Sequence, residues 1–207
     1  MLFDVKAEKV QYCTKVKIDS KTYASDHEIG KRTRRVFRTF ARVLIGRSLL
    51  REEVRQAEMS KLLHVVRHEV IHPILSTPEL VLSSQARFDE WHRAIVSTLK
   101  AKCPITWDRG SRLTVGTAQK IVNLHCKDLW ALNLVPSRYS MVFHPIIDRV
   151  TLGMLNKPGR LSWTKLDSYR DYMRLQLELR KMSERRGTYP SALECYHWNR
   201  YGRPRRR

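Results

Sequence analysis

The 207-residue sequence lacks paired cysteines, long apolar runs and an even balance of charge. Its cysteines (Cys13, Cys103, Cys126 and Cys195) are scattered, without the close spacing of a zinc knuckle or a secreted disulfide framework. We therefore expect reduced thiols and no metal or other cofactor. No stretch reaches the roughly 18 apolar residues of a membrane span, and the N-terminus lacks the apolar segment of a secretory signal. These absences favour a cytoplasmic, nucleoid-associated protein with no membrane partner.

Acidic residues are scarce: the chain has 20 Asp and Glu against 40 Lys and Arg, a formal charge of +20. Such a field suits a polyphosphate, because each phosphate neutralised by Lys or Arg releases condensed counterions. Nucleic acid is therefore the expected partner. The alternative is a merely basic surface of the ribosomal type, but 42% of the residues are apolar and their spacing is regular.

Apolar residues recur at helical spacing along most of the chain, and we found neither a strand pair nor an internal repeat. The prediction is an all-α, compact helical fold. Residues 1–28 are expected to form at most a short strand or an extended arm, residues 29–199 a helical domain, and residues 200–207 a flexible basic tail. Predicted helices cover residues 29–45, 52–72, 77–102, 114–132, 148–155 and 164–187, and a last short one begins at Ser191.

Helix ends are predicted from capping residues and proline. Pro73 is expected to end the second helix, because it lacks an N–H. Thr77 and Pro78 form a strong start for the third. Asp148 is a good N-cap, and Thr164 with Asp167 resembles a capping box.

Two segments carry dense positive charge. In residues 29–45 the basic side chains share one side of the predicted helix and form a candidate DNA-binding stripe. Its members are Lys31, Arg34, Arg35, Arg38 and Arg42. The tail has five arginines in its last eight residues and is expected to bind phosphates.

One short motif matches the zinc-protease pattern, in which two histidines one helical turn apart flank a general-base glutamate. It consists of His68, Glu69 and His72. Zinc would need a third ligand, for which Glu90 and His92 are candidates. The alternative is a helical face of partly exposed histidines. Our preferred interpretation is that the motif binds no metal.

Residues Leu113-Thr-Val-Gly-Thr-Ala-Gln-Lys-Ile-Val-Asn-Leu-His-Cys-Lys127, followed after a loop by Pro145-Ile-Ile-Asp-Arg-Val150, carry a resemblance to a known family. Over residues 105–156 the chain resembles the helix-hairpin-helix DNA glycosylases, and within them most the archaeal 8-oxoguanine glycosylase branch. The resemblance aligns Thr114-Val115-Gly116 with their hairpin turn. It also aligns Asp148 with the aspartate that opens their next helix.

A hairpin ending at Gly116 would expose unpaired N–H groups at a helix start, where a phosphate binds well. Thr114, Val115, Gly116 and Thr117 are therefore candidate DNA-binding residues, and Arg149 joins them.

A lysine on an apolar helix wall loses hydration, so its neutral amine becomes available to attack a sugar C1′. Lys127 is the first choice for this role and Lys120 the second. Asp148 would stabilise the developing oxocarbenium charge. Alternatively, Lys127 is only a phosphate contact and Asp148 only an N-cap.

Chemistry on a base within a duplex requires flipping the base into a pocket. Tyr139, Phe143 and His144 are the preferred base contacts because they lie on a predicted loop. Trp107, Trp130 and Trp163 are further aromatic candidates.

The sequence thus predicts a monomeric DNA glycosylase that excises a damaged or modified base, such as one in phage DNA, and leaves an abasic site. A lyase step remains open. The alternatives are a non-enzymatic nucleic-acid-binding protein and a DNA-associated zinc protease.

Overall fold

The computed structural model describes residues 4–23, 25, 27–33, 60–102, 113–157 and 161–202. These residues form helices joined by loops, with no strand among them, and so the all-α prediction is confirmed. The elements are α1 (Val5–Val16), the π-helix η1 (Val66–Ile71), α4 (His72–Ser76), α5 (Pro78–Leu82), α6 (Gln85–Lys102), α7 (Val115–Ala131), α8 (Ser137–Ser140), α9 (Arg149–Met154), the 3-10 helix η2 (Trp163–Lys165), α10 (Tyr169–Glu184) and α11 (Pro190–Tyr201). Residues 27–33 and 60–65 are also helical.

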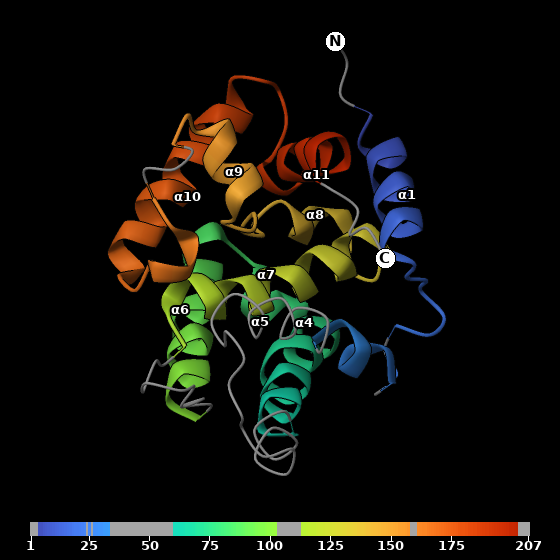
Figure 1. Ribbon diagram of the computed structural model, residues 1–207. Helices are drawn as coiled ribbons and strands as arrows, with labels where there is room; N and C mark the ends of the chain where they lie inside the picture. Colours follow the sequence, from blue (N-terminus) through green and yellow to red (C-terminus); the bar gives the residue numbers. More distant parts are fainter. Residues whose placement is uncertain are drawn as a thin grey trace, which may run out of the picture.

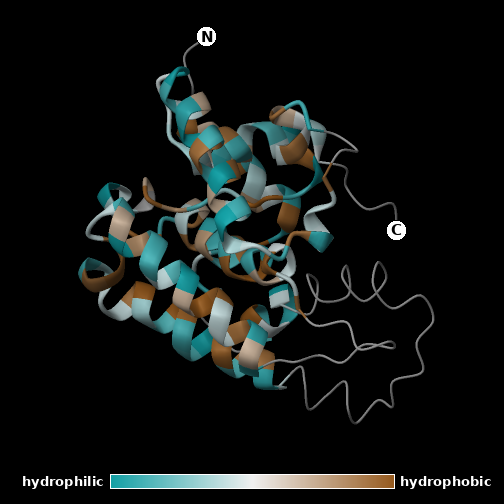
Figure 2. Ribbon diagram, turned by 90° about the vertical axis from the view of Figure 1, so that its left-hand side faces the viewer, coloured by the Kyte–Doolittle hydropathy of each residue, from teal (hydrophilic) through white to brown (hydrophobic). Residues whose placement is uncertain are grey.

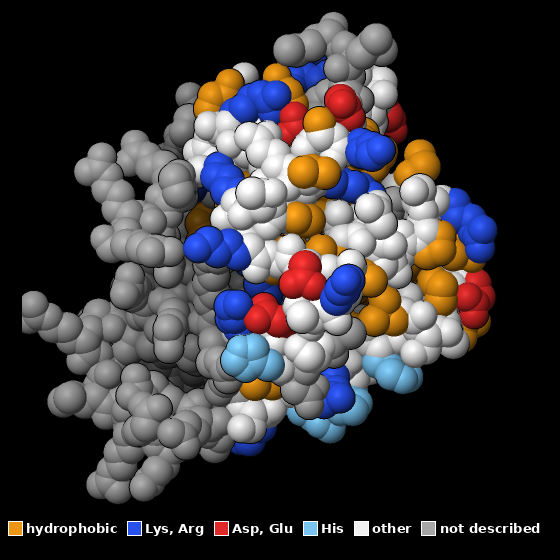
Figure 3. Space-filling model, turned by 90° about the vertical axis from the view of Figure 1, so that its right-hand side faces the viewer, with side chains coloured by type: hydrophobic (Ala, Val, Ile, Leu, Met, Phe, Trp, Pro, Cys, Tyr) orange, Lys and Arg blue, Asp and Glu red, His pale blue; other side chains and the backbone are white. Residues whose placement is uncertain are grey.

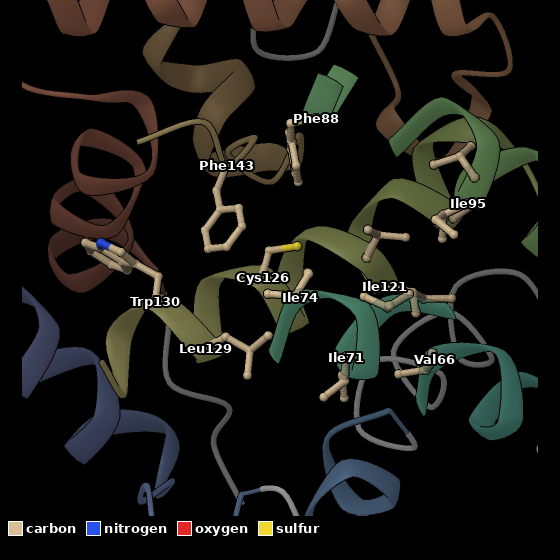
Figure 4. Packing of buried hydrophobic residues seen from close by; sticks show 14 of the residues in the cluster. Val66, Ile71, Ile74, Phe88, Ile95, Ile121, Cys126, Leu129, Trp130 and Phe143 are labelled. Carbon is tan, nitrogen blue, oxygen red and sulfur yellow. The ribbon is translucent and has the colours of Figure 1, made fainter. Parts of the chain in front are cut away.

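Helix α7 crosses the centre of the molecule and is covered on nearly every side (Figure 1). Its apolar side chains Ile121, Cys126 and Leu129 pack into the core cluster. Ile74 of α4 and Phe88 of α6 belong to the same cluster (Figure 4). Most residues of α7 are buried, polar ones included, so other helices must surround it, and α7 organises the fold.

Helix α10 is the clearest amphipathic helix among the described elements. Figure 2 shows hydrophobic and hydrophilic residues alternating along the helices. In α10, Tyr172, Leu175 and Leu179 recur at three- and four-residue spacing and are buried, whereas charged residues occupy the remaining face. This periodicity is the signal from which the sequence predicted helices. No helix within the described ranges is long and apolar enough to cross a membrane.

The N-terminal segment differs from the prediction. The expectation of a short strand or extended arm over residues 1–28 is wrong, because α1 is a regular helix that packs against α7 and α11. Its Tyr12 and Val16 lie in the core. Helix α1 is weakly patterned because polar partners bury part of it: Glu8 accepts hydrogen bonds from Asn199. Because these buried residues are polar and their partners lie far away in the sequence, α1 lacks the apolar spacing from which a helix is predicted.

Pro73 does not end a helix, and the prediction that it would was wrong. Helix α4 continues directly from η1, with Pro73 in its first turn. The N–H of His72 donates to the carbonyl of Arg67, five residues back. This wider π-type pairing and the free first turn of α4 accommodate a residue that has no N–H.

The single helix predicted for residues 77–102 is two helices, α5 and α6. The chain breaks at Ser83 and Ser84, and the Ser84 hydroxyl accepts from the N–H of Arg87 at 3.2 Å. Serine competes with the helix by bonding to nearby backbone, and here it caps the second helix.

Helix α10 starts later than expected. Thr164 lies in η2, and the N-cap of α10 is Ser168, whose side chain accepts from the N–H of Asp171. The capping box predicted for Thr164 and Asp167 is therefore wrong. Asp167 instead accepts a hydrogen bond from the N–H of Val115, at the start of α7.

Candidate functional site

The start of α7 packs against the segment around η2, and its backbone N–H groups are hydrogen-bonded within the protein. Thr114 is the N-cap of the helix, and its side chain accepts from the N–H of Thr117. The Gly116 N–H donates to the Leu166 carbonyl at 2.7 Å, and the Thr117 N–H donates to Thr114 Oγ1 at 3.3 Å. With Val115 bonded to Asp167, these donors are all occupied. The expectation that this turn exposes unpaired N–H groups for a phosphate is therefore wrong.

Gly116 allows the backbone of residues 163–166 to pack directly against the start of α7. A Cβ at this position would lie 1.7 Å from the carbonyl oxygen of Trp163. Only glycine lets the 163–166 backbone approach so closely. The glycine thus serves packing of α7 against η2.

The structure brings together two of the predicted catalytic residues, Lys120 and Asp148. Lys120 Nζ donates to Asp148 Oδ2 at 3.1 Å, although Lys120 lies on α7 and Asp148 is the N-cap of α9. Their side chains are 19% and 13% exposed, so the pair lies at the edge of the core. The pair joins a lysine and a carboxylate at a position that solvent reaches.

Asp148 is fixed in direction by its capping role, which the sequence predicted. Its Oδ1 accepts from the N–H groups of Val150 at 2.8 Å and Thr151 at 3.4 Å. In return, Thr151 Oγ1 accepts from the Asp148 N–H at 2.8 Å. This capping box uses Oδ1 and leaves Oδ2 directed at Lys120.

The electrostatics of the pair keep Asp148 ionised. Burial by itself raises the pKa of the carboxyl, but the Lys120 ammonium and the two cap N–H groups outweigh it and lower the pKa below its usual value. The Lys120 ammonium also lies 4.6 Å from the centre of the Trp163 ring, a cation–π contact. The candidate Trp163 thus lies beside the pair.

Lys127, the first-choice catalytic residue, lies two turns further along α7 in a separate buried pair. Its Nζ donates to Glu194 Oε1 of α11 at 2.8 Å, and the two side chains are only 3% and 1% exposed. The rings of Tyr12 and Trp198 lie 4.4 and 5.1 Å from the ammonium. Lys127 therefore has no direct contact with Asp148 and little contact with solvent.

Glu194 is the residue that sequence reasoning missed. Burial raises the pKa of its carboxyl, and Lys127 opposes that effect. The sequence placed Glu194 only within the last predicted helix, which begins at Ser191. The available signal was indirect: a lysine on an apolar helix requires a buried acid somewhere in the chain.

Arg149 is exposed on α9, next to a hollow of about 410 Å³ between α9 and α11. His197 and Tyr201 of α11 also line this hollow. The Tyr201 side chain is 65% exposed. A volume of this size falls in the range of small-ligand pockets, roughly 300–1,000 Å³.

Two of the predicted base contacts are core residues. Phe143 is 1% exposed and packs against Phe88, and His144 is 2% exposed. The expectation that they contact a base is wrong, because both side chains are buried in the core. Tyr139 is half-buried against the core, and Trp130 is fully buried.

His144 belongs to a buried hydrogen-bonded network. Its Nε2 lies 2.7 Å from Asp89 Oδ1, and its Nδ1 lies 2.8 Å from the hydroxyl of Tyr172. Arg180 pairs with both oxygens of Asp89. Arg180 also lies 2.8 Å from His144 Nε2, and burial lowers the pKa of His144 although Asp89 opposes that effect.

The zinc-protease motif lies on η1 and the start of α4. Glu69 pairs with Lys102 at 2.6 Å, and His72 Nε2 lies 3.3 Å from the Ser76 hydroxyl. The candidate third ligand His92 is buried, with both ring nitrogens engaged elsewhere. Within the described ranges no three His, Cys, Asp or Glu side chains gather as a metal site.

The basic stripe lies almost wholly outside the described residues. Lys31 is exposed on helical residues 27–33 and pairs with Glu28 at 2.9 Å. The remaining stripe residues, Arg34, Arg35, Arg38 and Arg42, fall outside, as do Trp107 and tail residues 203–207. Arg200, at the end of α11, pairs with Glu8 of α1 at 2.8 Å.

Comparison with known proteins adds no relative. No protein-family model, curated protein or solved structure matches this chain.

Proposed function

We propose that the protein is a DNA glycosylase that uses Lys120 and Asp148 at the sugar of an extruded nucleotide. The observation that carries this proposal is the 3.1 Å contact between Lys120 Nζ and Asp148 Oδ2. The two residues are 28 positions apart, and a capping box fixes the direction of the carboxylate. The formal charge of +20 supports a nucleic-acid substrate.

The geometry favours Lys120 over Lys127 for the chemistry. Lys120 reaches the surface beside Asp148, whereas Lys127 is enclosed by Glu194 and two aromatic rings. A catalytic group must come within hydrogen-bond reach of the reacting atoms. Lys120 meets this condition without rearrangement of the core.

In the proposed reaction the ionised Asp148 stabilises the positive charge that develops at C1′ as the glycosidic bond breaks. The base leaves with the bonding electron pair and takes a proton from the Lys120 ammonium. A water molecule adds to C1′ and returns one proton to the Lys120–Asp148 pair. The products are a free base and an abasic site. Attack by the Lys120 amine in place of water would instead give a covalent imine and open the lyase route.

The test is incubation with a panel of modified duplexes, followed by alkaline cleavage at abasic sites. Asp148→Asn is the sharpest variant, because asparagine caps a helix as well as aspartate does but carries no charge. We expect it to retain the fold and to lose excision by on the order of 100-fold or more. Lys120→Gln should show a comparable loss, and Lys165→Gln, an exposed lysine of η2, is the control.

Borohydride distinguishes the two routes. Trapping of the protein on modified DNA, lost in Lys120→Gln, would assign the covalent route. Abasic sites without trapping would assign hydrolysis. If Asp148→Asn and Lys120→Gln both excise at the wild-type rate, the site assignment is wrong.

A non-enzymatic nucleic-acid-binding protein is the second candidate. The burial of Phe143 and His144, which removes two proposed base contacts, favours it. Salt-dependent binding to DNA with no abasic site on any modified duplex would select this function over base excision.

A further inference from the structure

A groove of about 900 Å³ lies on the surface between α1 and the segment that follows α7. Lys6, Lys9 and Lys17 line it from α1 and its C-cap. Asn133 lies on the opposite side, and Asp19 is the one acidic residue among the described residues that line the groove. Figure 3 views the side of the molecule that carries α1, where Lys and Arg side chains lie among hydrophobic ones.

Lys9 is the unusual member of this groove. It is only 9% exposed, and its Nζ donates to Asn133 Oδ1 at 2.7 Å and lies 4.8 Å from the centre of the Trp130 ring. An ammonium carries three N–H donors, and no carboxylate within the described ranges pairs with this one. Burial lowers the pKa of Lys9, which reflects an incompletely compensated charge.

Lys6 and Lys17 extend the positive charge along the groove, and neither forms an ion pair with a described residue. Because α1 rises about 1.5 Å per residue, Lys6 and Lys17 lie roughly 16 Å apart along the helix axis. That length covers roughly five phosphates of one strand at about 3.4 Å per nucleotide. A single phosphate would contact only one of these lysines.

We propose that this groove binds the sugar–phosphate backbone of a nucleic-acid strand, with Lys6, Lys9 and Lys17 as its contacts. Each ammonium neutralises a phosphate, and an oxygen of the strand supplies an acceptor for the donors that Asn133 leaves unused on Lys9. Tyr189, which also lines the groove, offers a ring beside the strand.

The groove lies at the opposite end of α7 from the candidate catalytic pair. Lys120 and Trp130 are ten residues apart, or roughly 15 Å along the helix. The groove is therefore a separate contact that does not depend on base excision. An unmodified oligonucleotide tests it without a substrate base, so its failure and that of the glycosylase proposal are distinguishable.

The test compares two triple variants with the same net charge. One replaces the groove lysines by glutamine (Lys6→Gln, Lys9→Gln and Lys17→Gln). The matched control replaces three exposed cations of η2 and α10 (Lys165→Gln, Arg170→Gln and Lys181→Gln). Fluorescence anisotropy across a salt series, with single-stranded and duplex arms, gives the affinity and its salt dependence for each.

We expect the groove variant to lose on the order of 100-fold in affinity for the single strand at 0.1 M salt. Three lost contacts at about 0.7 counterions each reduce the slope of log affinity against log salt by about two. A duplex should show the same order of loss. Equal losses in the groove and control variants would overturn the proposal, because net charge alone would then explain binding.

Acetylation of the intact protein gives a readout that misfolding of a variant cannot imitate. We expect either oligonucleotide to protect Lys6 and Lys17 from acetylation, and Lys165 and Lys181 to react as before. Unprotected Lys6 and Lys17 at saturating oligonucleotide would refute the assignment. Protection by inorganic phosphate but by neither oligonucleotide would assign the groove to a lone anion and would also refute it.

Discussion

The buried Lys127–Glu194 pair allows the role of Lys127 to be tested by removing its charge with and without its partner. Lys127→Met alone leaves Glu194 as a buried carboxylate without its cation. Breaking a buried pair in this way typically costs about 3–5 kcal/mol. For a protein of this size, 1 kcal/mol corresponds to about 2–4 °C in Tm, so we expect a fall of roughly 6–20 °C by calorimetry.

The double variant Lys127→Met/Glu194→Leu removes both charges at once. Replacing a buried ion pair by apolar residues of similar volume is often neutral or stabilising. We therefore expect the double variant to regain most of the stability that Lys127→Met loses. Methionine also retains the contact with the rings of Tyr12 and Trp198.

Excision by the double variant then separates structure from catalysis. If Lys127 acts only through its pair with Glu194, the double variant should excise the modified base at close to the wild-type rate. A stable double variant without excision would refute the reasoning and return Lys127 to the catalytic role. A double variant as unstable as Lys127→Met would refute the energetic argument itself.

Four further predictions concern stability. Gly116→Ala should destabilise by at least about 1–3 kcal/mol in urea unfolding, because its Cβ would overlap the Trp163 carbonyl. Gly153→Ala in α9 meets nothing within 4 Å and should stabilise by roughly 0.5–1 kcal/mol. Burial holds the pKa of His125 near 4, against about 6.5 in the unfolded chain. The unfolded chain therefore binds the proton more tightly, and the free energy of unfolding is about 3 kcal/mol higher above pH 6.5 than below pH 4. This difference is lost as the pH falls from 6.5 to 4. The variant His125→Gln should therefore show a weaker dependence of the free energy of unfolding on pH over that interval. Arg32→Met should cost about 3–5 kcal/mol, because it leaves Asp128 buried without the guanidinium that pairs with both of its oxygens.

Each of these predictions has a contrary outcome. Equal effects of alanine at the two glycines would contradict the close contact between α7 and η2. An unchanged pH profile in His125→Gln would mean that other buried groups set the acid limit. A loss in Arg32→Met that matches that of the exposed Lys31→Met would contradict the buried pairing with Asp128.

The sequence predicted the local features of the site well. Asp148 caps α9 as expected, because an N-cap is decided by residues within three positions. The apolar spacing of α7 likewise predicted its helix. These signals depend on neighbours along the chain, which a single sequence contains.

The partners of the charged residues could not be predicted in the same way. Glu194 pairs with Lys127 across 67 positions, and Arg180 with Asp89 across 91. The start of α7 offered a phosphate site on local grounds, but Leu166 and Asp167 already occupy its donors. Tertiary contacts decide which charged and N–H groups remain free to bind a ligand. Spacing along the sequence cannot predict these contacts.

The central position of α7 also determines how fast its backbone amide hydrogens exchange with solvent. Nearly all of its residues are buried, and it contacts η1, α1, α6, α10 and η2. Its amides cannot reach solvent unless those neighbours separate. The interior amides of α7 should therefore exchange only through global unfolding, and their exchange rate in deuterated water measures the stability of the whole domain.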